Sequence, residues 1–273
     1  MLNFLPIIFA SALFASTVSA TNAGIGTASA TVQLGGVDTN LLKSVALLRD
    51  DAEGLMEQKR IIRVLLSDKP ESASTLVGVS FPPALGLARQ GQLKGMLLEF
   101  DPSDRTRMRV TLLAKPDVGG VSLESISLFN SQGLWQSLHV TPDRIEGSYQ
   151  SSGDGVPSFG FDAPLASDAI VADLKGIEAQ KSEPLQVLIA RAEAIRDGDL
   201  TTAVRLSSAD SANTLRFLPT AALTQVAAGM SELIRELRSS NRVVVRKSSA
   251  AAILSEGSFA SAVLENGSWK AAD

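Results

Sequence analysis

Short apolar runs alternate with turn-forming residues between residues 30 and 165. Runs of this length, recurring about every 8 to 12 residues, are typical of an antiparallel sandwich or barrel. Residues 51–54 and 101–104 are clear turn signals between neighbouring runs. We therefore predict a β-rich domain over residues 30–165. Its expected strands cover residues 43–50, 60–67, 93–100, 108–113, 121–129, 134–140, 144–150 and 159–165.

Residues 71–90 interrupt that pattern. Pro82 and Pro83 stand in the middle of this stretch, and consecutive prolines forbid a continuous helix. We expect a short helix and a loop there.

Helical spacing replaces the strand pattern after a connector. Residues 166–183 are rich in small and charged side chains, and we expect a linker that is partly helical. Pro184 then suits the first turn of a helix that ends at Gly198. Asp199 is placed to cap a second helix over residues 200–207.

A longer helix is predicted from Pro219 to about residue 238, followed by strands. Its apolar positions form one stripe, which we expect to be buried against a sheet. The strands cover residues 242–246, 250–255 and 258–264, and an Asn266-Gly267 turn leads residues 269–271 back to pair. The stripe consists of Leu223, Val226, Ala227, Met230, Leu233, Ile234 and Leu237.

This order of elements resembles the nuclear-transport-factor-two-like (cystatin-like cone) superfamily. The matching residues are Arg196-Asp197-Gly198-Asp199, the alternation over residues 250–254, and Glu265-Asn266-Gly267-Ser268-Trp269-Lys270. The resemblance covers residues 184–273 and implies a curved sheet wrapped around a helix, with a cone-shaped pocket. That superfamily contains enzymes and non-catalytic exported binding domains, so the fold does not select a function.

The first domain resembles an uncharacterised bacterial exported β-rich family. The resemblance rests on residues 63–70, on Arg144-Ile145-Glu146-Gly147, and on residues 161–165. That family's first strand carries a His-Ala-x-Ala pattern, for which this chain has Lys43-Ser44-Val45-Ala46. The predicted fold class is therefore α+β, with an N-terminal antiparallel sandwich or barrel followed by a C-terminal helix-plus-curved-sheet cone.

The first twenty residues predict export. They contain no Asp, Glu, Lys or Arg, carry an apolar run and end in Val18-Ser19-Ala20, as a signal peptide does. A second possible cleavage site follows Ala23, and residues 21–29 are expected to be a flexible leader. The alternative is an uncleaved anchor, although residues 4–20 are at the lower limit for crossing a bilayer and no Lys or Arg follows until Lys43. We expect a soluble periplasmic or secreted protein with no stable membrane insertion.

The composition excludes several classes of partner and of functional site. The net charge of −4, without a basic stripe, argues against nucleic acid as a partner. The chain has no Cys, which excludes disulfides, thiol catalysis and Cys-based zinc or iron–sulfur sites.

Catalytic motifs are absent from the sequence. The single histidine, His139, lies in a predicted strand, and no Gly-x-Ser-x-Gly elbow or phosphate-binding loop occurs. In the second domain, the strand carboxylates Glu256 and Glu265 stand beside turns and are expected to face solvent. We therefore predict no catalytic, cofactor-binding or metal-ligating residue and no cofactor.

These observations predict a non-enzymatic two-domain protein that binds or scaffolds in the bacterial envelope. Its expected partner is another envelope or extracellular protein, or a small apolar ligand. One alternative is a carrier or enzyme that uses the cone pocket. Another is an inhibitor or immunity protein for a secreted partner.

Overall fold

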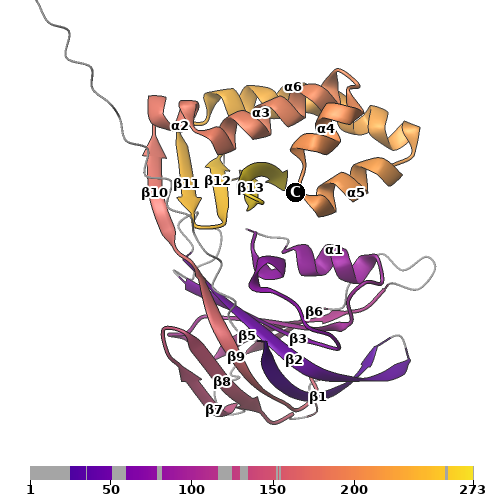
Figure 1. The fold of residues 1–273 in the computed structure, drawn as a ribbon, viewed down its shortest axis with the longest axis vertical. Coiled ribbons are helices and arrows are strands. Elements are labelled where there is room, and N and C mark those ends of the chain that lie inside the picture. The colour runs from indigo at the N-terminus through magenta and orange to yellow at the C-terminus, as the bar shows by residue number, and fades with distance from the viewer. Residues whose placement is uncertain are drawn as a thin grey trace, which may run out of the picture.

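The computed structural model describes residues 25–34, 36–50, 60–78, 82–115, 125–129, 135–151, 153, 155–255 and 258–272. The predicted signal peptide, residues 1–20, and the predicted turn at residues 51–54 lie outside the described residues. The chain is of mixed α and β structure, with two sheets and helices gathered mainly on the second (Figure 1). No helix among the described residues is long and apolar enough to cross a bilayer.

Nine strands form the first sheet, called here the large sheet, in the order β6-β5-β4-β3-β2-β1-β9-β8-β7. Except for one parallel contact, neighbouring strands are antiparallel, and every predicted strand of this region has a counterpart. The strands are β1 (Gly26–Leu34), β2 (Val37–Asp50), β3 (Arg60–Ser67), β4 (Gly95–Phe100), β5 (Arg107–Leu113), β6 (Ser125–Phe129), β7 (Trp135–Val140), β8 (Arg144–Tyr149) and β9 (Phe159–Asp168).

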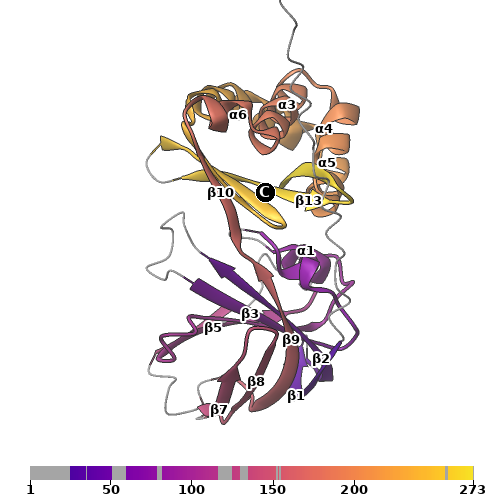
Figure 2. The same ribbon diagram turned by 60° about the vertical axis from the view of Figure 1, so that its left-hand side comes forward.

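The large sheet curls on itself (Figures 1 and 2). Aromatic and branched side chains pack together as its core. Phe100 of β4 and Trp135 of β7 belong to strands far apart in the sheet order, yet their ring centroids lie 5.3 Å apart. Trp135 also contacts Tyr149 and Phe159 edge-on. The curl therefore closes over one face and forms a half-barrel.

Residues 26–29 belong to β1, so the prediction of a flexible leader is wrong for them. Small residues such as Thr27 and Ala28 carry no strand pattern, but β1 is held between β2 and β9. Where β1 begins, β9 crosses onto β2 and pairs with it in parallel. Gly26 permits this, because a Cβ atom there would lie 2.3 Å from the carbonyl oxygen of Asp162.

The opposite face of the large sheet packs on a short segment between β3 and β4. This segment holds the 3-10 helix η1 (Ala73–Leu76) and α1 (Pro83–Arg89), which matches the predicted short helix and loop. Buried Arg63 of β3 donates to the carbonyl oxygens of Leu76 and Gly78, and its Nε atom lies 3.0 Å from Glu99 Oε1. These bonds anchor η1 to the sheet.

Five antiparallel strands form the second sheet, called here the small sheet, in the order β10-β11-β12-β13-β14. Its strands are β10 (Ile170–Lys175), β11 (Arg242–Arg246), β12 (Ser249–Ile253), β13 (Phe259–Glu265) and β14 (Ser268–Ala272). The helices are α2 (Ile177–Lys181), α3 (Glu183–Arg196), α4 (Leu200–Leu206), α5 (Ala209–Phe217) and α6 (Thr220–Ser239). Figure 2 shows α3 and α6 above this sheet and α1 below it.

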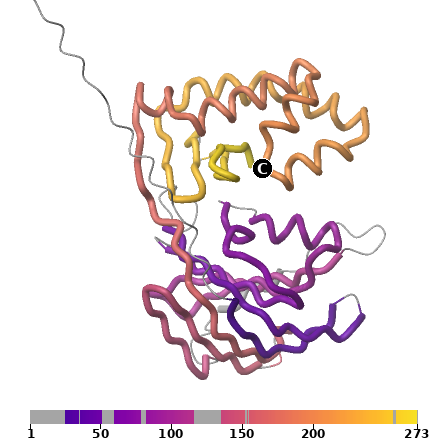
Figure 3. Tube along the Cα trace, in the orientation of Figure 1, coloured from indigo at the N-terminus to yellow at the C-terminus, as the bar shows by residue number. Residues whose placement is uncertain are grey.

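Half of the predicted linker over residues 166–183 instead belongs to the two sheets, while its expected helical part is present as α2. β9 runs to Asp168, and after Ala169 the chain continues as β10, which pairs with β11 (Figure 3). The pattern misled because β10 is an edge strand with exposed side chains and carries no continuous apolar run.

The turn and cap predictions of the C-terminal part are confirmed. Asp199 accepts a hydrogen bond from the backbone N–H of Thr202 and caps α4. Hydrogen bonding by the side chain and backbone of Thr202 lowers the pKa of Asp199. Asn266 and Gly267 have φ angles of 50° and 76°, as a tight hairpin turn between β13 and β14 requires.

The predicted burial of the α6 stripe is only half right. Ile234 and Leu237 are buried against the small sheet, whereas the five apolar residues before them are half-buried. The reason is α5, which the sequence analysis missed. The first half of α6 packs on a separate cluster with Ile195 of α3 and Leu215 of α5.

The two sheets share a core. Val263 and Ala272 of the small sheet pack with Leu76 and Ala84 and with the outer face of the large sheet. At the other end of this junction, buried Asp168 accepts hydrogen bonds from Ser249 Oγ and the backbone N–H of Ser248. These contacts fix how the two parts meet.

Candidate functional site

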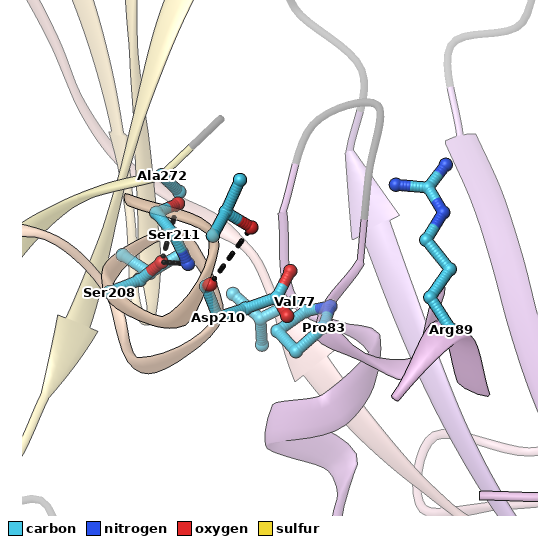
Figure 4. A pocket seen from close by; sticks show the side chains of 9 residues that line it. Val77, Pro83, Arg89, Ser208, Asp210, Ser211 and Ala272 are labelled. Carbon is cyan, nitrogen blue, oxygen red and sulfur yellow. Dashed lines mark hydrogen bonds between the residues drawn. The ribbon is translucent and has the colours of Figure 1, made fainter. Parts of the chain in front are cut away.

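A groove lies where α1 of the N-terminal part meets α5 of the C-terminal part. It consists of two adjoining hollows of about 300 Å³ and about 590 Å³, which share Arg89, Asp210 and Thr214. The inner hollow is seen in Figure 4. It is lined in addition by Val77, Pro83, Ser208, Ser211, Val263 and Ala272, and the outer one by Gly86, Gln90, Gln92, Lys115, Asn213 and Phe217.

Gly86 and Asp210 set the spacing between the two helices. A Cβ atom at Gly86 would lie 1.9 Å from Asp210 Oδ1, so a glycine permits the close approach. The same Oδ1 atom accepts a hydrogen bond of 3.1 Å from Gln90 Nε2. This contact links segments more than a hundred residues apart in the chain.

The first turn of α5 is held from several sides. The backbone N–H of Ser208 donates to Ala271 of β14 at 2.8 Å, and that of Ala209 lies 3.3 Å from Glu265 Oε1. The Ser208 hydroxyl donates to Ser211 Oγ at 3.0 Å (Figure 4). The inner hollow therefore has a fixed wall of hydroxyl groups over an apolar floor of Val77, Val263 and Ala272.

The outer hollow is charged and hydrogen-bonding. The exposed side chains of Arg89 and Lys115 line this hollow. Phe217, at the end of α5, lines it too and is 84% exposed. Two cations and an exposed aromatic ring therefore share one hollow.

The groove offers binding groups more than reactive ones. Its hydroxyls, amides and cations can donate hydrogen bonds, and the Ser208 hydroxyl donates to Ser211 Oγ. No group of three His, Asp or Glu residues is close enough to hold a metal ion in the part of the chain that the structure describes.

The structure places the sequence-identified candidates apart from the groove's ligand-facing walls. His139 is exposed on β7, which lies at the bottom of the view in Figure 1, away from α1 and α5. Glu265 is half-buried and contacts the first turn of α5, so it is not simply solvent-facing as predicted. Glu256 lies outside the described residues.

Sequence reasoning missed the groove because its walls come from residues 77–115 and 208–217. One signal was present: Phe217 precedes Leu218-Pro219 at the end of a polar stretch, and an apolar helix end before proline is a place to look for exposed aromatic rings.

Comparison of the chain with family models, with curated proteins and with solved structures finds no match in any of the three. The groove's own geometry is therefore the basis for assigning a function.

Proposed function

We propose that this chain is an exported, non-catalytic binding protein that receives an extended, acidic segment of another envelope or extracellular protein in the groove between α1 and α5. The observation that carries the proposal is the combination of Arg89, Lys115 and exposed Phe217 around one groove. Arg89 and Lys115 outnumber Asp210 among the charged residues that line the groove, which favours an acidic partner, and an exposed aromatic ring is a common anchor of protein interfaces.

The polar lining supports an extended peptide as the occupant. Gln90, Gln92 and Asn213 line the outer hollow, and side-chain amides donate to and accept from a peptide backbone. The wall at Ser208 is already held by hydrogen bonds to β14, so little ordering is needed on binding.

The fold assignment belongs to the same proposal. We take the small sheet and its five helices to be a cone of the nuclear-transport-factor-two-like superfamily, and the large sheet to be the β-rich domain before it. The order of elements and the Asn266-Gly267 turn support this. Export to the periplasm or beyond rests on residues 1–20.

The alternative of a carrier or enzyme with a cone pocket has less support. Between the small sheet and α3, the buried side chains of Ala252, Ala262, Leu188 and Ile189 pack as one cluster. The alternative of an inhibitor or immunity protein uses the same groove and differs only in the identity of the partner.

A peptide-binding measurement tests the proposal. Fluorescence anisotropy would compare labelled peptides that alternate Glu with apolar residues against the same peptides with Lys in place of Glu. We expect only the acidic set to bind, and Arg89→Glu and Lys115→Glu each to weaken binding about tenfold, or about 1.4 kcal/mol. Lys181→Glu, an equal charge change on α2, is the matched control.

Crosslinking in the cell envelope would identify the partner. A photoreactive residue at Thr214, in the groove, is compared with one at exposed Ala221 on α6. A partner captured only from position 214, and lost with Arg89→Glu, supports the proposal, and a secreted toxin or enzyme as that partner would favour the inhibitor alternative. Equal binding of acidic and basic peptides, unaffected by either charge reversal, would overturn it.

A further inference from the structure

The outer strand of the small sheet has an open edge. β10 is the first strand in the sheet order, and β11 is the strand that pairs with it among the described residues. Every second residue of an antiparallel edge strand directs its N–H and C=O groups away from the sheet. Such groups are a template for pairing with another strand.

Exposed apolar side chains surround this edge. Val171 is 59% exposed, Ile170 36%, and Ile177, at the start of α2, 73%. The β10–β11 register shifts between Ile170 and Ala172, so Val171 stands outside the ladder. Ile170 and Val171 lie at one end of β10 and Ile177 follows the other end, so a strand paired along this edge would cover apolar side chains at both ends.

The order of the exposed side chains identifies that strand. Asp173 and Lys175 stand on one face of the regular part of β10, between exposed Val171 at the register shift and exposed Ile177 at the start of α2. We propose that a second copy of this chain pairs antiparallel with β10, about a two-fold axis at Leu174. Asp173 of each copy then lies opposite Lys175 of the other, and the pairing brings Val171 of one copy near Ile177 of the other, beyond the paired residues.

The neighbouring registers are less favourable. Opposed residues of paired strands share a face, so a two-fold axis must pass through a residue. An axis at Asp173 would set two carboxylates opposite each other, and an axis at Ala172 would set Val171 against Asp173. Like charges directly opposite are destabilising, whereas opposite charges and apolar pairs stabilise the sheet.

Contacts within the chain orient the Asp173 carboxylate and leave Lys175 beside another cation. The Asp173 carboxylate receives two hydrogen bonds from Arg242, of 2.8 Å and 3.2 Å, which hold it at the edge. Lys175 stands opposite Arg242 in the β10–β11 register, so it has a cation on its inner side. A carboxylate from the second copy on its outer side offsets that repulsion. The pairing joins two small sheets into one and leaves no open β10 edge.

Sedimentation equilibrium of the full chain over a range of concentrations tests the inference. We expect a monomer–dimer equilibrium that Lys175→Asp and Asp173→Lys each weaken at least tenfold. An equimolar mixture of these two variants restores dimers, because each unlike pair then opposes Asp and Lys. Lys94→Asp, at an exposed position just before β4 of the large sheet, is the control and is expected to leave the monomer–dimer equilibrium unchanged.

Asp173→Lys also removes the partner of Arg242, so circular dichroism is recorded for every variant. If that variant is unfolded, Val171→Glu replaces it, since this exposed side chain lies outside the ladder and covering its charge with the second copy costs desolvation free energy. A chain that stays monomeric at all concentrations overturns the inference. So does a dimer that Lys175→Asp and Val171→Glu leave equally tight.

Discussion

The two sheets of this protein are stabilised by cores whose side chains differ in size. The large sheet encloses large side chains, among them Phe100, Trp135 and Phe161. The small sheet presents alanines to its helices, including Ala250, Ala252 and Ala262. A sheet that curls on itself has an interior to fill, whereas short side chains let a helix lie close to the small sheet. Several buried aromatic rings therefore fill the first core, whereas the second consists of buried aliphatic side chains with the half-buried ring of Trp269 packed against them.

The comparison predicts that shortening a buried side chain destabilises the large sheet more than the small one. Phe100 is 1% exposed, and Phe100→Ala is expected to lower the free energy of unfolding by about 3–5 kcal/mol because a ring-sized cavity remains. Urea unfolding followed by fluorescence measures this. The chain has two tryptophans, Trp135 in the large sheet and Trp269 in the small one, so single-Trp variants report on each sheet.

Because the sheets share the core around Val263, both tryptophans are expected to report the same lowered midpoint. A shift seen only by Trp135 would show that the two parts unfold separately. In that case the two sheets would differ in their free energy of unfolding as well as in the size of their core side chains.

Enlarging a buried side chain, in contrast, is expected to destabilise the small sheet. Ala252 is 1% exposed against α3, and Ala252→Leu is expected to cost about 1–3 kcal/mol because the helix must move away. Ala221→Leu on the exposed side of α6 is the matched control and should change little. Thermal unfolding measures both, and equal effects would contradict the close packing of helices on this sheet.

Two glycines of the C-terminal part should respond in opposite directions to alanine. Gly267 has a φ of 76°, so Gly267→Ala is expected to destabilise by about 1–2 kcal/mol. Gly229 lies within α6 with nothing within 4 Å of an added Cβ, so Gly229→Ala is expected to stabilise by about 0.5–1 kcal/mol. Parallel denaturant titrations compare them, and shifts of the same sign would show that the hairpin or the helix is misassigned.

The smallest effect concerns charge at the edge of the small sheet. The hydrogen bond from Arg242 lowers the pKa of Asp173 below its usual value of 3.8. A lowered pKa stabilises the fold above the unfolded pKa, and this contribution is lost as the pH falls through the folded pKa. Asp173→Asn should therefore destabilise by less than about 1 kcal/mol at pH 7 and not at all at pH 2.

Guanidinium titrations at the two pH values, with exposed Glu178→Gln as the control, measure this difference. An Asn variant that is equally destabilised at both pH values would mean that packing, not charge, is lost.

Local rules recovered much of the fold from the sequence. Turn chemistry placed the hairpins around residues 101–104 and at Asn266, and capping placed Asp199, because these signals act over a few residues. Tertiary context decided the rest. β1 and β10 are strands through their neighbours, and α5 diverts half of the α6 stripe away from the sheet.

The candidate site was beyond sequence reasoning for a related reason. Gly86 reads as an ordinary small residue in a short helix, and Asp210 as an ordinary first-turn carboxylate. Their significance comes from a contact between helices that no periodicity encodes. Residues 209–217 were not predicted to form a helix, so the sequence analysis did not place Phe217 beside a groove.

Because β9 continues directly into β10, β10 is synthesised well before β11, the strand with which it pairs. When β10 leaves the ribosome, β9 is already made, but β11 follows only after residues 176–241. At about 5–20 residues per second, β10 waits roughly 3 to 13 seconds for its partner. The large sheet can form before the small one, and the small sheet, with its long-range pairing, is expected to close last.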